Sequence, residues 1–132
     1  YGIARGNLSN TLLHAAAFEQ QIAKVAVIEP LLSYQSIIMH KYYQPEWIHG
    51  TVPGSIPVYD IPDLAACIAP RKLWMVNVQD QRMRQASLEE INKTYCFTRK
   101  VYQSRNSESN FAIKPWPGFL DFSEMIQEWL GT

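Results

Sequence analysis

The first residues that could do chemistry stand in a short stretch bracketed by two glycines, from Gly2 to Gly6. Glycine permits the close backbone approach and the positive φ angle that a tight turn between a strand and a helix requires. A nucleophile elbow of the G-x-S-x-G type uses such a turn to lift a serine hydroxyl above a sheet. The central residue here is Ala4, so the sequence predicts the frame of an elbow that lacks its nucleophile.

Ser9 is the first hydroxyl beyond that frame, and His14 follows in the same Leu- and Ala-rich segment. Ser9 has two interpretations, a displaced nucleophile or a capping or first-turn residue of the helix that the segment predicts. We favour the second interpretation. His14 stands in the middle of an apolar helix, and for it we favour a packed side chain over a general base.

Asp80 is the candidate acid, because it follows a predicted buried strand at residues 72–78. The carboxyl ends of parallel strands form the edge at which α/β proteins bind their ligands. Two interpretations stay open for this carboxylate. It could be the acid of a catalytic triad, or it could be a buried or loop-capping acid without a reaction of its own.

An irregular segment, residues 34–59, is expected to form an insertion over the site. Its prolines and glycines break any long helix or strand. Its aromatic rings could stack on sugar rings or pack the insertion against the domain, and we favour packing. Tyr34 and Trp47 are the candidate substrate contacts. The aromatic residues of the insertion are Tyr34, Tyr42, Tyr43, Trp47 and Tyr59.

The residue spacing predicts neither a metal site nor a disulfide scaffold. His40 and His49 lie near Asp60 and Asp63 in the sequence, but this spacing matches no known class of metal site. We therefore predict no metal and no other cofactor. The chain has two cysteines, too few for a disulfide scaffold, and Cys67 stands in an apolar run that predicts a buried thiol.

Hydrophobic periodicity divides the chain into alternating helices and strands. Nearly continuous apolar runs predict strands covered on both faces, at residues 24–28, 72–78 and 111–114. Amphipathic segments predict helices after the first turn and at residues 60–71, 87–102 and 121–130, with Asp60 as a cap. This order predicts an α/β fold with about three parallel strands, right-handed crossovers and flanking helices.

Composition excludes several classes of partner. The 132 residues are expected to form a single domain, and the 47% hydrophobic and 18% charged residues are typical of a globular protein. Twelve basic and twelve acidic residues cancel, which argues against nucleic acid and an anionic membrane as partners. No apolar run approaches the roughly 18 residues that span a bilayer.

A family resemblance rests on two adjoining stretches, Asp63-Leu-Ala-Ala-Cys-Ile-Ala-Pro-Arg71 and Leu73-Trp-Met-Val-Asn-Val-Gln-Asp80. Together with the elbow frame they resemble the C-terminal half of an α/β-hydrolase. Within that superfamily the chain is similar to bacterial acetyl xylan esterases and glucuronoyl esterases. The resemblance covers nearly the whole chain. It implies a periplasmic or secreted setting, and it implies that the first strands and one oxyanion-hole donor belong to a missing N-terminal half.

The resemblance also assigns roles to single positions. The nucleophile position falls on Ala4, and the acid position falls on Asp80. The base position follows the last strand, where active relatives carry a Gly-His pattern and this chain carries Gly118 and Phe119. The backbone N–H of Arg5 would form part of the oxyanion hole. Two of the three triad side chains are therefore absent, and natural decay of the site explains both losses.

Three hypotheses follow from these residues. The first is a catalytically inactive esterase-like domain that still binds a carbohydrate or an ester. The second is an active carboxylic-ester hydrolase that uses other residues or the missing N-terminal half. The third is an interaction module, because a sheet without its neighbouring strand exposes an edge that invites pairing. We expect a homo-oligomer through that edge or association with the N-terminal half.

Overall fold

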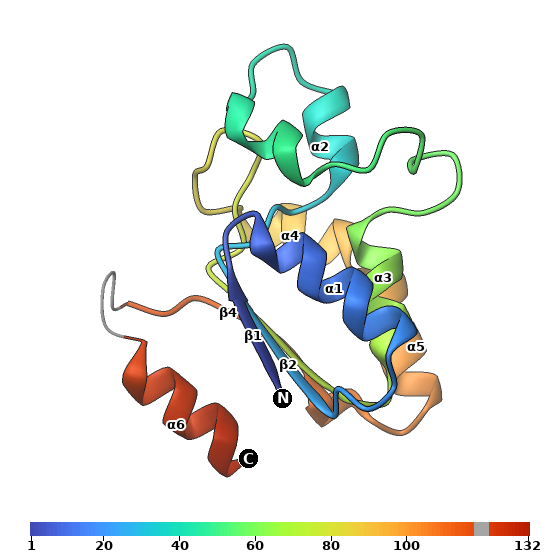
Figure 1. Cartoon of the computed structure of the whole chain (residues 1–132), viewed down its shortest axis with the longest axis vertical. Coiled ribbons are helices and arrows are strands. Elements are labelled where there is room, and N and C mark those ends of the chain that lie inside the picture. Colours follow the sequence, from blue (N-terminus) through green and yellow to red (C-terminus); the bar gives the residue numbers. More distant parts are fainter. Residues whose placement is uncertain (118–121) are drawn as a thin grey trace.

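The computed structural model describes residues 1–117 and 122–132, which contain a four-stranded, all-parallel sheet (Figure 1). The strands lie in the sheet in chain order: β1 (Gly2–Arg5), β2 (Lys24–Ile28), β3 (Lys72–Val76) and β4 (Phe111–Lys114). Each pair of neighbouring strands is joined through at least one helix, because parallel strands need a long crossover. The predicted arrangement of parallel strands flanked by helices is confirmed.

Helices cover the two faces of the sheet unequally (Figure 1). On one face α1 packs against α3, and α3 packs against α5. Among the described helices, α6 alone covers the opposite face. The helix bounds are α1 (Leu8–Phe18), α2 (Tyr34–Ile38), α3 (Ile61–Ile68), α4 (Leu88–Thr94), α5 (Cys96–Ser104) and α6 (Ser123–Gly131), with short 3-10 helices η1 (Pro45–Gly50) and η2 (Glu108–Asn110).

The larger hydrophobic core lies between the sheet and the three-helix layer. Val27 of β2, Met75 of β3 and Leu13 of α1 are completely buried there. The strand residues next to them in sequence point the other way, since side chains alternate along a strand. The central strands are therefore covered on both faces, and their continuous apolar runs reflect that burial.

The smaller core lies between the sheet and α6. Ile28 and Trp74 of the central strands pack with Met125 and Trp129, and both α6 side chains are completely buried. The spacing of four residues between Met125 and Trp129 places them on one helix face. The amphipathic helix predicted near the end of the chain is confirmed over Ser123–Gly131.

The expected turn over Gly2 to Gly6 is wrong, because these residues begin with β1. The sheet consequently has four strands in the described residues rather than about three. Ala4 pairs with Val27, and Arg5 pairs with Ile28. A segment this short and glycine-rich lacks a strand pattern of its own, so its conformation is set by pairing with β2.

The single helix predicted over residues 87–102 is two helices, because Tyr95 departs from helical geometry with φ −99° and ψ 14°. Its phenol is completely buried and donates a hydrogen bond to the carbonyl oxygen of Leu32 at 2.9 Å. The amphipathic pattern of residues 87–102 would turn Leu88 inward, but Leu88 is 72% exposed. It stands in the first turn after the Ser87 cap and projects away from the core that Ile91 enters.

The Cys67 thiol was expected to be buried, and the structure exposes it instead. The inward face of α3 is formed by Ile61, Leu64, Ala65 and Ile68, which follow the helical repeat of three and four residues. Cys67 lies outside that repeat and therefore faces away from the core, although its sequence neighbours are apolar.

The insertion, residues 34–59, lies beyond the carboxyl ends of the strands, where Figure 1 shows α2 and η1 above the sheet. Parallel α/β domains bind their ligands on that side of the sheet. The insertion is therefore placed to shape any binding site. None of the described helices has the length and hydrophobicity needed to cross a membrane.

Candidate functional site

The turn after β1 has its left-handed residue at Gly6, two positions later than expected for the elbow. Gly6 has φ of +60°, and its N–H donates to the carbonyl oxygen of Ile28 at 2.9 Å. Ala4 precedes this turn and lies within the strand. A Cβ built on Gly6 would find no atom of the described residues within 4 Å outside its chain neighbours. The tip of the turn is open and carries no side chain.

Arg5 also precedes the turn, at the end of β1, and its oxyanion-hole role stays a prediction. In an elbow the amide that faces the reacting oxygen belongs to the residue after the tip. That residue is Asn7 when the tip is Gly6. Asn7 is the first residue of the helical turn that starts α1, with φ −61° and ψ −29°.

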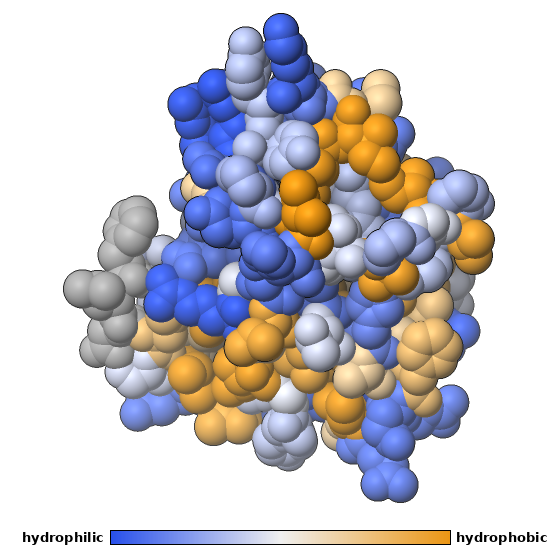
Figure 2. All heavy atoms as spheres, turned by 45° about the horizontal axis from the view of Figure 1, so that its top comes forward, coloured by the Kyte–Doolittle hydropathy of each residue, from blue (hydrophilic) through white to orange (hydrophobic). Residues whose placement is uncertain are grey.

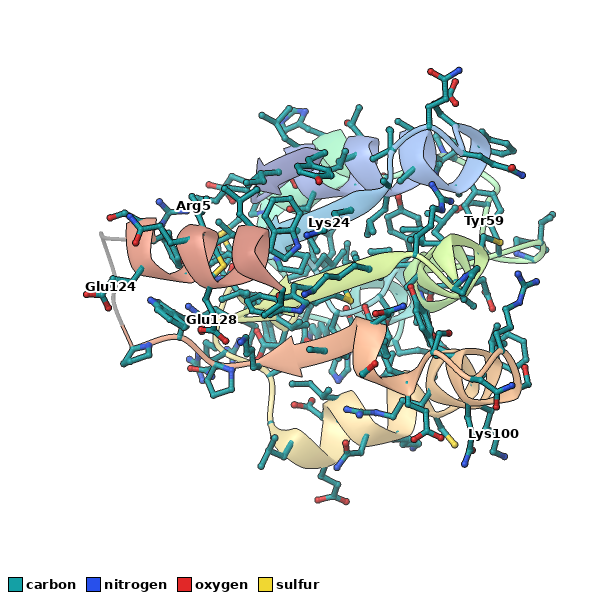
Figure 3. All side chains as sticks on the ribbon, turned by 90° about the horizontal axis from the view of Figure 1, so that it is seen from below. Arg5, Lys24, Tyr59, Lys100, Glu124 and Glu128 are labelled. Carbon is teal, nitrogen blue, oxygen red and sulfur yellow. The ribbon has the colours of Figure 1, made fainter. Side chains whose placement is uncertain are left out.

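The Arg5 side chain forms an ion pair at the carboxyl edge of the sheet. Its Nε donates to Glu29 Oε2 at 2.6 Å, and this hydrogen bond raises the pKa of the Arg5 guanidinium. The guanidinium also lies over the Phe122 ring, 5.3 Å from its centroid, and Figure 3 shows Arg5 between β1 and α6. Glu29 holds a left-handed backbone, φ +53°, which non-glycine residues adopt only under local constraint.

Ser9 and His14 are both held by the protein. Ser9 is completely buried in the first turn of α1, and its Oγ donates at 3.5 Å toward the carbonyl oxygens of Ala4 and Ile28. His14 Nδ1 lies 2.7 Å from the carbonyl oxygen of Asn10, so Nδ1 donates and Nε2 accepts from the Tyr59 hydroxyl at 2.9 Å. The first-turn interpretation of Ser9 and the packed interpretation of His14 are confirmed.

The short helix η1 covers the start of α1. Asn7 Nδ2 donates to the carbonyl oxygen of Glu46 at 2.6 Å, and Asn10 Nδ2 donates to that of Gly50 at 3.1 Å. A Cβ on Gly50 would approach Asn10 Nδ2 to 2.9 Å, so glycine permits this close contact. The insertion is therefore fastened directly over the first turn of α1.

The two predicted substrate contacts belong to the core of the insertion. Trp47 is 1% exposed and Tyr34 is 2% exposed, so neither presents a ring face for stacking on a sugar. The Tyr34 hydroxyl donates to the carbonyl oxygen of Gly50 at 3.1 Å, and burial raises its pKa to about 12. The packing interpretation of these rings is confirmed.

Asp80 closes its own loop. Its Oδ1 accepts hydrogen bonds from the backbone N–H groups of Arg82 at 2.8 Å and Arg84 at 3.0 Å. This arrangement satisfies the loop-capping interpretation. The predicted base position, Phe119, lies outside the described residues, together with Gly118.

A polar crevice of about 560 Å³ lies beside α2 and the start of α3. We use the term polar crevice for this hollow, whose walls come from α2, α3, α4, α5 and the loop after β3. Its polar side chains include His40, Asp63, Gln81, Glu90 and Lys93, and Met39 and Phe97 add apolar surface. Its position at the carboxyl side of β2 and β3 is typical of α/β ligand sites.

Asp60 joins the two helices that flank the polar crevice. Its carboxylate accepts from the backbone N–H groups of Tyr34 at 2.6 Å and Gln35 at 3.1 Å, at the start of α2. It also accepts from the N–H of Ile61 at 2.6 Å, and Asp63 completes a capping box at the start of α3. The predicted cap is confirmed, and it serves two helices where the sequence indicated one.

Several polar atoms of the crevice are still able to bind a ligand once the hydrogen bonds within the protein are counted. His40 Nδ1 donates to the carbonyl oxygen of Ser36 at 2.7 Å, which leaves Nε2 as an acceptor. Glu90 Oε2 accepts from Ser87, so its second oxygen and the Lys93 ammonium provide an acceptor and a donor. The Ser-x-x-Glu capping pattern at Ser87 could have located this wall from the sequence. Across residues 1–117 and 122–132, no three His, Cys, Asp or Glu side chains gather as metal ligands.

Comparison with known proteins gives no family assignment. No protein-family model matches the chain, and no curated protein sequence matches it.

Proposed function

We propose that this chain is the C-terminal half of an α/β-hydrolase-like domain that has lost ester hydrolysis and binds a carbohydrate or ester ligand. The observation that carries the proposal is the tip of the turn after β1, which is the glycine Gly6 and offers no nucleophile. The nearest serine, Ser9, is completely buried. The parallel sheet and the insertion beyond its carboxyl edge support the comparison with α/β-hydrolases.

Ester hydrolysis by this route requires a hydroxyl nucleophile and a base that accepts its proton. Loss of a single triad member can lower the rate on the order of a million-fold. Asp80 uses one carboxylate oxygen to hold two backbone N–H groups of its own loop. Asp80 therefore stabilises its own loop. Within residues 1–117 and 122–132, no histidine hydrogen-bonds to its carboxylate.

The polar crevice suits a ligand with several hydroxyl groups. Carboxylate and imidazole acceptors stand beside an ammonium donor, and such mixed groups match hydroxyls that both donate and accept. Phe97 is 59% exposed at this crevice and can pack against the apolar face of a ring. Phe97 thus offers the sugar-stacking surface that was the less favoured interpretation of Tyr34 and Trp47.

A hydrolysis assay tests the loss of activity. We expect no turnover of 4-nitrophenyl acetate above the buffer rate for the chain or for Gly6→Ser, because the serine introduced at the tip has no base. Turnover that Ser9→Ala or Asp80→Asn abolishes, with the fold retained by circular dichroism, would contradict the proposal. It would favour the alternative of an active hydrolase that uses other residues or an N-terminal half.

A titration with xylobiose, followed by amide NMR, tests the binding site. We expect shifts around the polar crevice and a dissociation constant that rises about fivefold in Phe97→Ala, equivalent to roughly 1 kcal/mol. Tyr42→Ala is the matched control, because Tyr42 is 65% exposed and lies outside the polar crevice. Equal weakening in both variants, or shifts elsewhere, would remove the polar crevice as the site.

A second candidate function, assembly through β1, is favoured by the open side of the molecule. Within the described residues β1 pairs with β2 alone. Ile3 is 43% exposed, and the adjacent α1 exposes Leu8 at 68% and Phe18 at 85%. α1 contains no Asp, Glu, Lys or Arg. We propose a second copy as the occupant. A twofold axis would run the two β1 strands and the two α1 helices antiparallel, which opposes the helix dipoles favourably without like-charge repulsion.

Sedimentation velocity tests this assembly. We expect a dimer that Ile3→Lys converts to a monomer, because a charge on an edge strand opposes pairing. Val58→Lys is the control, since Val58 is 81% exposed on the insertion. A monomeric chain at all accessible concentrations would reject the second copy and would leave an N-terminal half, supplied in trans, as the partner to test.

A further inference from the structure

A second hollow lies on the other side of α2 from the polar crevice. It has a volume of about 430 Å³ and is formed by α2, η1 and the loop that follows η1. Ile37 and Ile38 of α2 line it, while Gln35 and Ser36 of the same helix line the polar crevice. We call this hollow the apolar pocket. Figure 2 shows hydrophobic residues gathered on the upper part of the molecule, where the insertion lies.

One hydroxyl of the apolar pocket has no hydrogen-bond partner among the described residues. Ser55 is 5% exposed and lines the pocket, and its backbone groups bond to Val52, Val58 and Tyr59. Within the described residues its Oγ has no hydrogen bond. The two other hydroxyls of the lining are already engaged, since Tyr34 donates to Gly50 and Thr51 donates to Ile48.

The charge of the lining limits the ligand class. No Asp, Glu, Lys, Arg or His lines the apolar pocket among the described residues. An ionised group placed inside would lose its hydration without gaining a counter-charge, which is strongly unfavourable. A hydrocarbon surface would instead be buried against isoleucine and valine side chains, and the unpartnered hydroxyl would supply a single directional contact.

We propose that the apolar pocket binds a small uncharged aliphatic molecule whose one polar group hydrogen-bonds to Ser55. A volume of 430 Å³ is equivalent to roughly fourteen liquid waters, and part of it is open to solvent, so a ligand of about ten non-hydrogen atoms fits. This site is distinct from the proposed carbohydrate site, because the two hollows are lined by different residues of α2.

Amide NMR titration of the full chain with 1-octanol tests the proposal, with octanoate as the charged comparison. We expect saturable shifts at Ile37, Thr51 and Ser55, and at least tenfold weaker binding of octanoate at pH 8. Ile38→Asp should weaken 1-octanol binding at least tenfold, because Ile38 is 65% exposed at the rim and lines the pocket. Ser55→Ala should weaken it about threefold to tenfold.

The matched control is Val58→Asp, which adds the same charge at an exposed residue outside the pocket lining. Retained binding in this variant, with loss in Ile38→Asp, supports the site. Equal binding by Ile38→Asp and Val58→Asp, shifts outside the insertion, or equal affinity for octanoate would overturn the proposal. The outcome is also separable from the xylobiose titration, since the two ligands would shift amides on opposite sides of α2.

Discussion

The two edges of the sheet are built differently. At β4, the Phe111 ring is 7% exposed and stacks on Tyr102 with centroids 5.0 Å apart. Lys114 at the end of the same strand pairs with Glu128 at 2.9 Å and lies over the Trp74 ring, 3.5 Å from its centroid. This edge carries a buried aromatic pair and a lysine, and a charged side chain is one of the features that protect edge strands.

At β1 these protections are weaker. Ile3 is 43% exposed, and the adjacent α1 presents exposed leucine and phenylalanine side chains. Arg5 is the charged residue of this strand, and it is committed to Glu29. The comparison indicates that β4 is packed more firmly than β1, and this difference is the physical basis of the proposal that a further strand pairs with β1.

The largest expected effect is a difference in the free energy of unfolding between substitutions at the two edges. Phe111→Ala should lower the free energy of unfolding by about 3–5 kcal/mol, because it leaves a cavity against Tyr95 and Tyr102. Ile3→Ala should lower it by less than about 1 kcal/mol in the monomer. Urea denaturation measures both values. Similar losses for the two substitutions would show that β1 is packed as firmly as β4.

An effect of intermediate size is expected at the β4 edge, where Tyr102 should make the free energy of unfolding depend on pH. Burial raises the pKa of Tyr102 above its usual value of 10.0, and its hydroxyl donates to the carbonyl oxygen of Arg71 at 3.0 Å. A raised folded pKa means that the unfolded chain loses its proton first, so stability is complete below pH 10 and falls as the pH rises further.

Tyr102→Phe should therefore cost about 0.5–1.5 kcal/mol at pH 7, through the lost hydrogen bond. It should also make the decline above pH 10 less steep, while the raised pKa values of buried Tyr34 and Tyr95 maintain the rest of it. Thermal unfolding between pH 7 and 11 measures both quantities. Tyr42→Phe, at a residue that is 65% exposed, is the control. An unchanged alkaline slope in Tyr102→Phe would assign that decline to other groups.

The smallest expected effect concerns Lys114. Its side chain is 28% exposed and that of Glu128 is 48% exposed, so solvent screens their attraction. Lys114→Met keeps the aliphatic stem over Trp74 and removes the charge, and it should cost about 0.5–1 kcal/mol. Lys100→Met on α5 provides the exposed control in the same urea experiment. A more stable Lys114→Met variant would mean that burial outweighs the charge contacts at this edge.

Local sequence patterns predicted those strands that are covered by the core. Residues 24–28 and 111–114 were located as strands because covered strands are apolar throughout, and Asp60 was located as a cap by its position before Pro62. β1 was missed, since Gly2 to Arg5 becomes a strand only by pairing with β2. The parallel α/β class could thus be predicted, while the first strand and its turn could not.

The candidate site was harder to predict, because its groups come together from distant parts of the chain. His40, Gln81 and Lys93 share the polar crevice although about forty and about ten residues separate them. No sequence spacing encodes that proximity. Conversely, Tyr34 and Trp47 are residue types that often stack on ligands. Only their burial in the structure shows that they pack the insertion instead.

The double cap at Asp60 has a consequence for communication between the two hollows. One carboxylate fixes the start of α2, and α2 forms a wall of both the polar crevice and the apolar pocket. A molecule that tilts this short helix from one side necessarily alters the wall seen from the other. Occupancy of the two hollows is then thermodynamically linked, and the affinity change must be equal in both directions.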